Sequence, residues 1–157
     1  MLTRRVPARP LLGIHPAIVL AVLDFIGLLV AGYLSVVEAF GGIPVCGPIK
    51  GCEEVALSEY ARIGGVPVAF FGVLLSVALL GLALAWWKTD IYGLLLAHYG
   101  LSLIGVLFDG YFLYLQVFVI GAVCIWCVTY EVSLLVRFLI AFVVWYRQPK
   151  PGESDEY

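Results

Sequence analysis

The chain of 157 residues contains four cysteines, arranged in two pairs that could support thiol–disulfide chemistry. Cys124 and Cys127 form a C-x-x-C pair within the apolar stretch "VCIWCVTYE", and Cys46 and Cys52 lie in the one long polar loop. Helix residues three apart share a face, and the first turn of a helix favours thiolate over thiol. The C-x-x-C pair therefore has the geometry of a reversible redox couple, although two cysteines that simply pack against a neighbouring helix fit the motif equally well.

The loop pair can close a small disulfide, because Gly47, Pro48 and Gly51 allow the chain to turn between Cys46 and Cys52. A static structural bridge is one interpretation, since such bridges are common in extracellular loops. A bridge across so short a loop removes little entropy from the unfolded chain, which weakens that interpretation. Zinc binding by all four thiolates lacks the paired short spacing of zinc ribbons, and we expect no metal.

Together the two pairs predict a relay in which a thiolate of one pair attacks the disulfide of the other. Such a relay requires only that the two pairs meet at one surface. Thiol exchange moves electrons onward, so a further carrier must finally accept or donate them. A C-x-x-C pair beside a membrane pocket indicates a lipid-soluble carrier, and a quinone fits that description.

The cysteines are expected to lie at the ends of membrane helices and in the loop that joins two of them. Hydrophobic residues make up 63% of the chain and charged residues 13%, against about 45–50% and about 25% in soluble domains. Four segments reach the roughly 20 apolar residues that a spanning helix needs, at about residues 17–37, 67–87, 91–120 and 123–146. The sequence therefore predicts an all-α integral membrane protein built as a four-helix bundle, in which the long third segment tilts or projects.

The connections add two further expectations. The outer loop, at about residues 40–66, carries a short amphipathic helix in "CEEVALSEYA", with Val55, Leu57 and Tyr60 toward the membrane. The bundle domain then covers residues 1–146, and the polar residues 147–157 form a disordered cytoplasmic tail.

The basic residues predict the orientation of the bundle. Two of them fall on one side, Lys50 and Arg62, and six on the other: Arg4, Arg5, Arg9, Lys88, Arg147 and Lys150. We therefore expect a multi-pass protein of the cell membrane with both termini in the cytoplasm. All four cysteines then lie at the outer face, where disulfides persist. No basic run suggests binding to nucleic acid.

The order of the motifs resembles the vitamin K epoxide reductase family, particularly its bacterial and archaeal quinone-linked members. The loop pair comes first, then Ser58 six residues after Cys52, then "GVPVAFFG" at the second helix and "CIWC" at the head of the fourth. The resemblance implies that Cys46 meets a thioredoxin-fold partner, that Cys52 exchanges with Cys124, and that Cys127 donates electrons to the quinone. Ser58 is expected to support this catalytic site.

The same resemblance implies a quinone pocket beside Cys127, to which we assign Tyr130, Glu131, Val68 and Phe71. Val68 and Glu131 stand where vertebrate members carry an amide and a phenol that hold the quinone carbonyls. The resemblance therefore implies quinone reduction rather than epoxide reduction. The quinone would be ubiquinone, menaquinone or a related compound, and the expected role is disulfide formation in exported proteins.

The resemblance covers about residues 17–146. A different quinone-linked, disulfide-forming family has its C-x-x-C in the first outer loop, so the order of pairs here favours the first family. Because the chain ends shortly after its fourth helix, the thioredoxin-fold partner is expected to be a separate protein. The rival hypothesis is a non-catalytic membrane scaffold or assembly subunit with structural disulfides.

Ionisable residues inside spans are functional candidates by default, and there are four: Asp24, Asp109, Glu131 and Arg137. For Asp24 and Arg137, far from the cysteines, a structural ion pair or a snorkelling arginine is the favoured interpretation. Glu131 lies about one helical turn beyond Cys127 and is a candidate proton donor to a reduced quinone.

Two ring side chains receive structural interpretations. Trp126 is expected to be an anchor at the membrane interface, where indoles collect. His98 stands alone in an apolar segment, so we expect a buried imidazole with satisfied hydrogen bonds rather than a metal or haem ligand.

Overall fold

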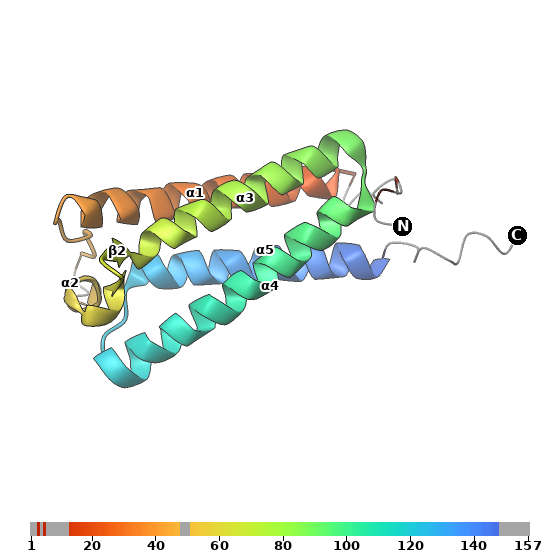
Figure 1. The fold of residues 1–157 in the computed structure, drawn as a ribbon. Helices are drawn as coiled ribbons and strands as arrows, with labels where there is room; N and C mark the ends of the chain where they lie inside the picture. The colour runs from red at the N-terminus through yellow and green to blue at the C-terminus, as the bar shows by residue number, and fades with distance from the viewer. Residues whose placement is uncertain (1–2, 4, 6–12, 48–50, 148–157) are drawn as a thin grey trace, which may run out of the picture.

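The protein is a bundle of four long helices with a small cap at one end (Figure 1). The structure, a computed structural model, describes residues 3, 5, 13–47 and 51–147. The long helices are α1 (Pro16–Ala39), α3 (Val68–Thr89), α4 (Tyr92–Tyr114) with its π-helical extension η2 (Leu115–Ile120), and α5 (Ile125–Arg147). Each is long and apolar enough to cross a membrane. This confirms the predicted all-α membrane bundle.

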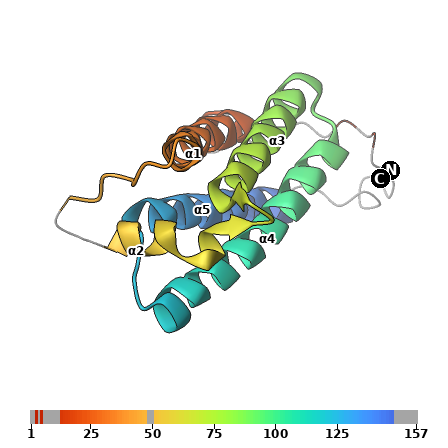
Figure 2. The same ribbon diagram turned by 60° about the vertical axis from the view of Figure 1, so that its left-hand side comes forward.

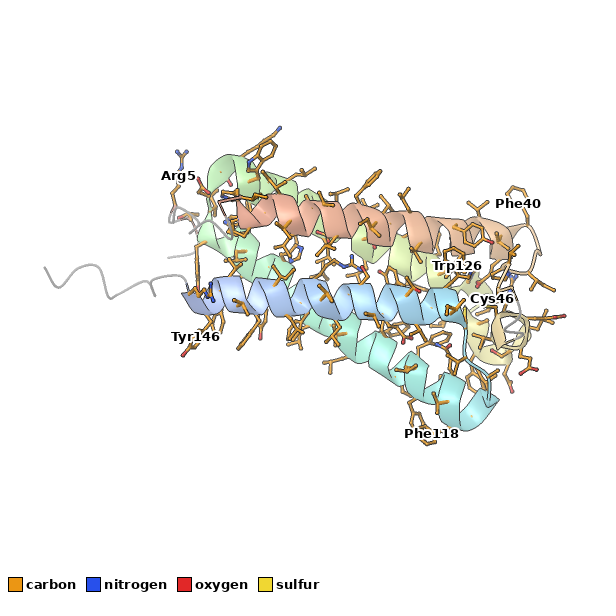
Figure 3. All side chains as sticks on the ribbon, turned by 180° about the vertical axis from the view of Figure 1, so that it is seen from behind. Arg5, Phe40, Cys46, Phe118, Trp126 and Tyr146 are labelled. Atoms are coloured by element: carbon orange, nitrogen blue, oxygen red, sulfur yellow. A yellow bond between two sulfur atoms is a disulfide. The ribbon has the colours of Figure 1, made fainter. Side chains whose placement is uncertain are left out.

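The predicted ends of the helices differ from these bounds by no more than two residues. The predicted tail lies outside the described residues except for Arg147, which is the last residue of α5. Helix α1 packs along α3 and α5, and α4 packs against α3 and α5. Figures 1 and 3 show α4 inclined to α5, as expected of the longest span.

The cap consists of α2 (Gly51–Leu57), the 3-10 turn η1 (Glu59–Ala61) and the hairpin β1 (Arg62–Ile63) and β2 (Val66–Pro67). These elements cover the end of the bundle where α1 ends and α5 begins (Figures 1 and 2). Figure 3 shows Cys46 and Trp126 at this end and Arg5 and Tyr146 at the opposite end. The fold thus separates the cysteine end from the end that holds most of the described basic residues.

The predicted helix in the outer loop is interrupted at Ser58. Its hydroxyl donates a hydrogen bond to the Val55 carbonyl at 2.7 Å, and its backbone N–H donates to the same oxygen at 3.2 Å. Val55 is 3% exposed, whereas Leu57 is 70% and Tyr60 is 38% exposed. The three side chains do not form one apolar face, because helix residues two apart point in different directions.

Three charged or ionisable side chains are buried together in the half of the bundle far from the cap. Arg137 Nη1 donates to Asp24 Oδ1 at 3.2 Å, which confirms the predicted ion pair, and both side chains are fully buried. Gly27 makes room for this contact, since a Cβ there would lie 2.8 Å from the guanidinium. His98 Nε2 meets Asp24 Oδ2 at 3.0 Å, while its Nδ1 has no partner among the described residues. The imidazole is therefore only half satisfied.

We predict that Asp24→Leu lowers the free energy of unfolding by about 3–5 kcal/mol, because it leaves the Arg137 charge buried and unpaired. The double variant Asp24→Leu/Arg137→Met should regain most of this loss, since it removes both charges. Unfolding in detergent by heat or denaturant measures the difference. Equal stability of the single and double variants would contradict the ion pair's role.

Candidate active site

Three cysteine sulfur atoms meet at the capped end of the bundle. Cys46 and Cys52 are joined by a disulfide, and the Sγ atoms of Cys46, Cys52 and Cys124 all lie within 4.8 Å of one another. Cys52 and Cys124 are each 1% exposed, while Cys46 is half-buried. The loop pair therefore has one reachable sulfur and one buried beside Cys124. Because the disulfide uses two of the three sulfurs, the zinc interpretation would require a reduced loop pair.

A close backbone approach brings the two pairs together. Gly51, the first residue of α2, lies so near the connection between α4 and α5 that a Cβ would collide with the Val123 backbone. Only glycine permits this approach, and it sets Cys52 directly against the C-x-x-C segment. Val55 and Ala122 fill the remaining space as apolar neighbours. Local sequence around either pair does not predict this contact.

Trp126, between the two cysteines of the C-x-x-C motif, ties the loop to α5. Its Nε1 donates to the Val45 carbonyl at 2.9 Å, and the Val45 N–H donates to the Tyr33 hydroxyl at 3.1 Å. The rings of Tyr33 and Trp126 pack with centroids 4.9 Å apart. Because Val45 precedes Cys46, this clamp holds one end of the loop disulfide. The interpretation of Trp126 as a membrane anchor did not include this contact.

Cys124 precedes α5 instead of lying in its first turn as predicted. Its carbonyl accepts from the Val128 N–H at 3.0 Å, and its Sγ accepts from the Cys127 N–H at 3.4 Å, which are the contacts of a helix N-cap. The pKa of Cys124 is lowered from 9.0 to about 7, chiefly by a hydrogen bond from the Cys127 thiol, while burial and the Glu38 charge oppose the shift. Cys124 is therefore prepared to act as a thiolate at neutral pH.

A cavity of about 360 Å³ lies beside the cysteines, among α1, α3, α4 and α5. Cys127 lines this cavity, and so do the four residues assigned to a pocket beside it: Tyr130, Glu131, Val68 and Phe71. Its volume lies within the range of about 300–1,000 Å³ typical of small-molecule sites. Ser58 is not part of the lining, and its hydroxyl instead holds the end of α2. The structure therefore brings together every predicted site residue except Ser58.

Few polar groups line this otherwise apolar cavity. The Tyr130 hydroxyl is already engaged, since it donates to the Gly72 carbonyl at 3.0 Å and lies 3.1 Å from the Ser76 hydroxyl. Glu131 Oε2 and Asp109 Oδ2 are buried and have no partner among the described residues. Asp109, which the sequence marked only as an ionisable residue, lines the same cavity. Two buried carboxyl oxygens are thus available to a ligand, and Glu38 adds a third carboxyl group to the lining.

Gln116 is a site residue that the sequence analysis missed. It is fully buried in η2, its amide oxygen accepts from the Cys124 N–H at 2.9 Å, and its amide nitrogen donates to Glu131 Oε1 at 3.3 Å. A lone amide inside an apolar span is costly to bury, as an ionisable side chain is. Including amides in the search for polar residues within spans would have identified it.

Two cysteine pairs in contact, one of them beside an apolar cavity in a membrane bundle, define a membrane thiol–disulfide oxidoreductase. The sequence model of the vitamin K epoxide reductase family matches residues 18–142. Because this match covers most of the chain and includes all four cysteines, the protein belongs to the vitamin K epoxide reductase family. The family match confirms the resemblance drawn from the cysteine motifs. No curated protein matches the chain in a direct comparison.

We predict that alkylation of Cys124 rises with pH through about pH 7 and levels off above it, because only the thiolate reacts and the pKa of Cys124 is about 7. Cys127→Ala should raise the midpoint by removing the hydrogen bond from the thiol, whereas Cys127→Ser keeps a donor and should raise it less. Rates of iodoacetamide labelling, resolved by mass spectrometry with the loop pair oxidised, measure this. A midpoint that is the same in the wild type and Cys127→Ala would contradict the assignment.

Proposed function

We propose that this protein oxidises the dithiol of a thioredoxin-fold partner and passes the electrons through its two cysteine pairs to a membrane quinone. Disulfide formation in exported proteins is the corresponding role. The observation that carries the proposal is the position of the C-x-x-C pair: Cys124 contacts the loop disulfide, and Cys127 lines the apolar cavity. One pair thereby adjoins both a thiol-exchange surface and a ligand site.

The first step concerns the loop pair. A thiolate of the partner attacks Cys46 Sγ, the Cys46–Cys52 bond breaks, and Cys52 leaves as a thiolate. The partner's second thiol then displaces Cys46, so that the partner leaves as a disulfide and the loop holds two thiols. The unequal burial of the two residues supports attack at Cys46, which is half-buried, rather than at Cys52, which is 1% exposed.

The second step transfers the electron pair to the C-x-x-C motif. The Cys52 thiolate attacks Cys124 Sγ of a Cys124–Cys127 disulfide, and Cys127 leaves as a thiolate. Cys46 then attacks Cys52, re-forms the loop disulfide and releases Cys124. The product of this step has a closed loop pair and free Cys124 and Cys127, which is the pairing in the structure.

The third step takes place at the cavity. A quinone held at the cavity would supply the electron acceptor, since its reduction to a hydroquinone would take up the two electrons and two protons that two thiols release when they form a disulfide. Cys127 would give up the electron pair as its bond to Cys124 re-forms. Glu131 would hold a proton at Oε2, which has no partner among the described residues, while Val68 and Phe71 would form part of the apolar wall of the cavity. Asp109 offers a second oxygen on the α4 side.

The purified protein in detergent, given a dithiol donor, should reduce a quinone, and Cys127→Ala should abolish the reaction because it removes the electron donor at the cavity. Glu131→Gln should slow the reaction while Cys127 remains. Quinone absorbance measures turnover, and unfolding curves establish that each variant is folded. Turnover by folded Cys127→Ala at the wild-type rate would refute the proposed outlet. A folded wild type without turnover would favour the scaffold hypothesis.

The orientation is also part of the proposal. Arg5, Lys88 and Arg147 lie at the end away from the cysteines, and cytoplasmic ends of membrane proteins are enriched in basic residues. This supports cytoplasmic termini and an outer cysteine face, where the thioredoxin-fold partner would meet Cys46. In intact cells, a membrane-impermeant thiol reagent should label Cys46 after mild reduction with an impermeant phosphine. Labelling only after lysis would reverse the orientation.

A further inference from the structure

Gln116 lies between Cys124, which faces the loop disulfide, and Glu131, which lines the cavity, and none of the steps above uses it. We propose that Gln116 is a positioning residue that holds Cys124 at the N-cap of α5 and orients the Glu131 carboxyl group. A single amide then sets the geometry of thiol exchange and of the cavity at once. The inference rests on the proposed function for the reaction that it serves, but the contacts that carry it are independent of that reaction.

The backbone of Gln116 is fixed by an unusual turn. It belongs to η2, where the helix widens to a π-helical form before the chain leaves the bundle. Its carbonyl accepts hydrogen bonds from the N–H groups of Gly121 and Ala122, the latter at 3.1 Å, and Gly121 takes the left-handed conformation with φ 73°. Short π-helical segments occur frequently at functional sites. This turn directs one polar side chain inward from an otherwise apolar helix end.

The side chain of Gln116 has both ends of its amide engaged. Because the Cys124 backbone N–H can only donate, the partner at 2.9 Å must be the amide oxygen, Oε1. The amide nitrogen therefore faces Glu131 and donates to its Oε1 at 3.3 Å. Gln116 is fully buried, so neither hydrogen bond is exchanged for one to water. Loss of the amide would leave the buried Cys124 N–H unpaired, which is costly in apolar surroundings.

The two partners of Gln116 flank Cys127 along α5, with Cys124 before it and Glu131 after it. The groups that face Cys124 are Cys127 and Glu131 on α5, Glu38 on α1 and the loop disulfide. Gln116 carries no charge, so it acts on this set by position. If Cys124 leaves the N-cap, it loses the hydrogen bonds from Cys127 and its contact with the loop sulfurs. Its thiolate is then less favoured.

A set of five variants tests the inference. Gln116→Leu removes both hydrogen bonds, and Gln116→Glu sets two carboxyl groups against each other. Gln116→Glu keeps an oxygen acceptor for the Cys124 N–H, and the swap Gln116→Glu/Glu131→Gln restores the hydrogen bond between the two side chains, now donated by the residue at 131. Glu131→Gln alone is the matched background for the swap, and Val117→Ala, at a 45% exposed neighbour in η2, controls for general disturbance.

The measurement is the rate of Cys124 alkylation at pH 7, resolved by mass spectrometry with the loop pair oxidised, in purified full-length protein. Losing a buried hydrogen bond should slow this rate about tenfold or more in Gln116→Leu. Gln116→Glu should also be slow, the swap should be faster than Gln116→Glu, and Val117→Ala should match the wild type. Unfolding curves on every variant separate this effect from loss of the fold.

Two outcomes would overturn the inference: wild-type alkylation in folded Gln116→Leu, or a swap that is as slow as Gln116→Glu. If Gln116→Leu does not fold, the comparison of Gln116→Glu with the swap decides. The assay needs no quinone, so it separates this inference from the proposed function. If the wild type reduces no quinone, the proposed function is refuted. If Gln116→Leu is then still alkylated slowly at Cys124, the inference stands.

Discussion

The position of Cys124 at the N-terminus of α5 is the constraint on which the rest of the site depends. From this position its sulfur touches the loop disulfide, while Cys127, in the first turn of the same helix, lines the cavity. Helical geometry alone could not achieve this, since two residues three apart in a regular helix share one face. Because Cys124 stands just outside the helix, the two sulfurs of one motif can serve two different neighbours.

Three contacts from distant parts of the chain hold Cys124 and its neighbours in place. Gly51 permits the cap to approach the α4–α5 connection, Trp126 clamps the loop before Cys46, and Gln116 binds the Cys124 N–H. Each comes from a different element, so the site forms only when the bundle and the cap are assembled together. The exchange chemistry itself needs little more than proximity and one thiolate, which is why so much of the local structure serves position.

The buried charges in the half of the bundle far from the cap also help to position the site. Arg137, held by Asp24, lies with its guanidinium carbon 5.4 Å from the centroid of the Tyr130 ring. Tyr130 in turn lines the cavity, and its hydroxyl donates a hydrogen bond to the Gly72 carbonyl on α3. The ion pair between α1 and α5 thus supports the cavity as well as the packing of the half of the bundle far from the cap. A buried pair of this kind is a better device for fixing helix register than for adding stability.

The sequence predicted those features that depend on residue type along the chain, and it missed those that depend on contacts between distant elements. Long apolar runs determined the four spans, and the order of the cysteine motifs identified the family. The N-cap position of Cys124 was missed because no Ser, Thr, Asp or Asn marks that helix start. The break at Ser58 was missed because its neighbours favour a continuous helix. The role of Gln116 depends on a π-helical turn that no local pattern announces.

In the proposed relay, Cys52 and Cys124 exchange directly. The most direct test leaves only these two cysteines, in Cys46→Ser/Cys127→Ser, and measures their cross-link in native membranes under mild oxidation by mass spectrometry. The relay predicts that the Cys52–Cys124 disulfide forms rapidly. It should form faster than the Cys46–Cys124 disulfide does in the matched variant Cys52→Ser/Cys127→Ser. A folded protein in which Cys52 and Cys124 fail to cross-link would contradict it.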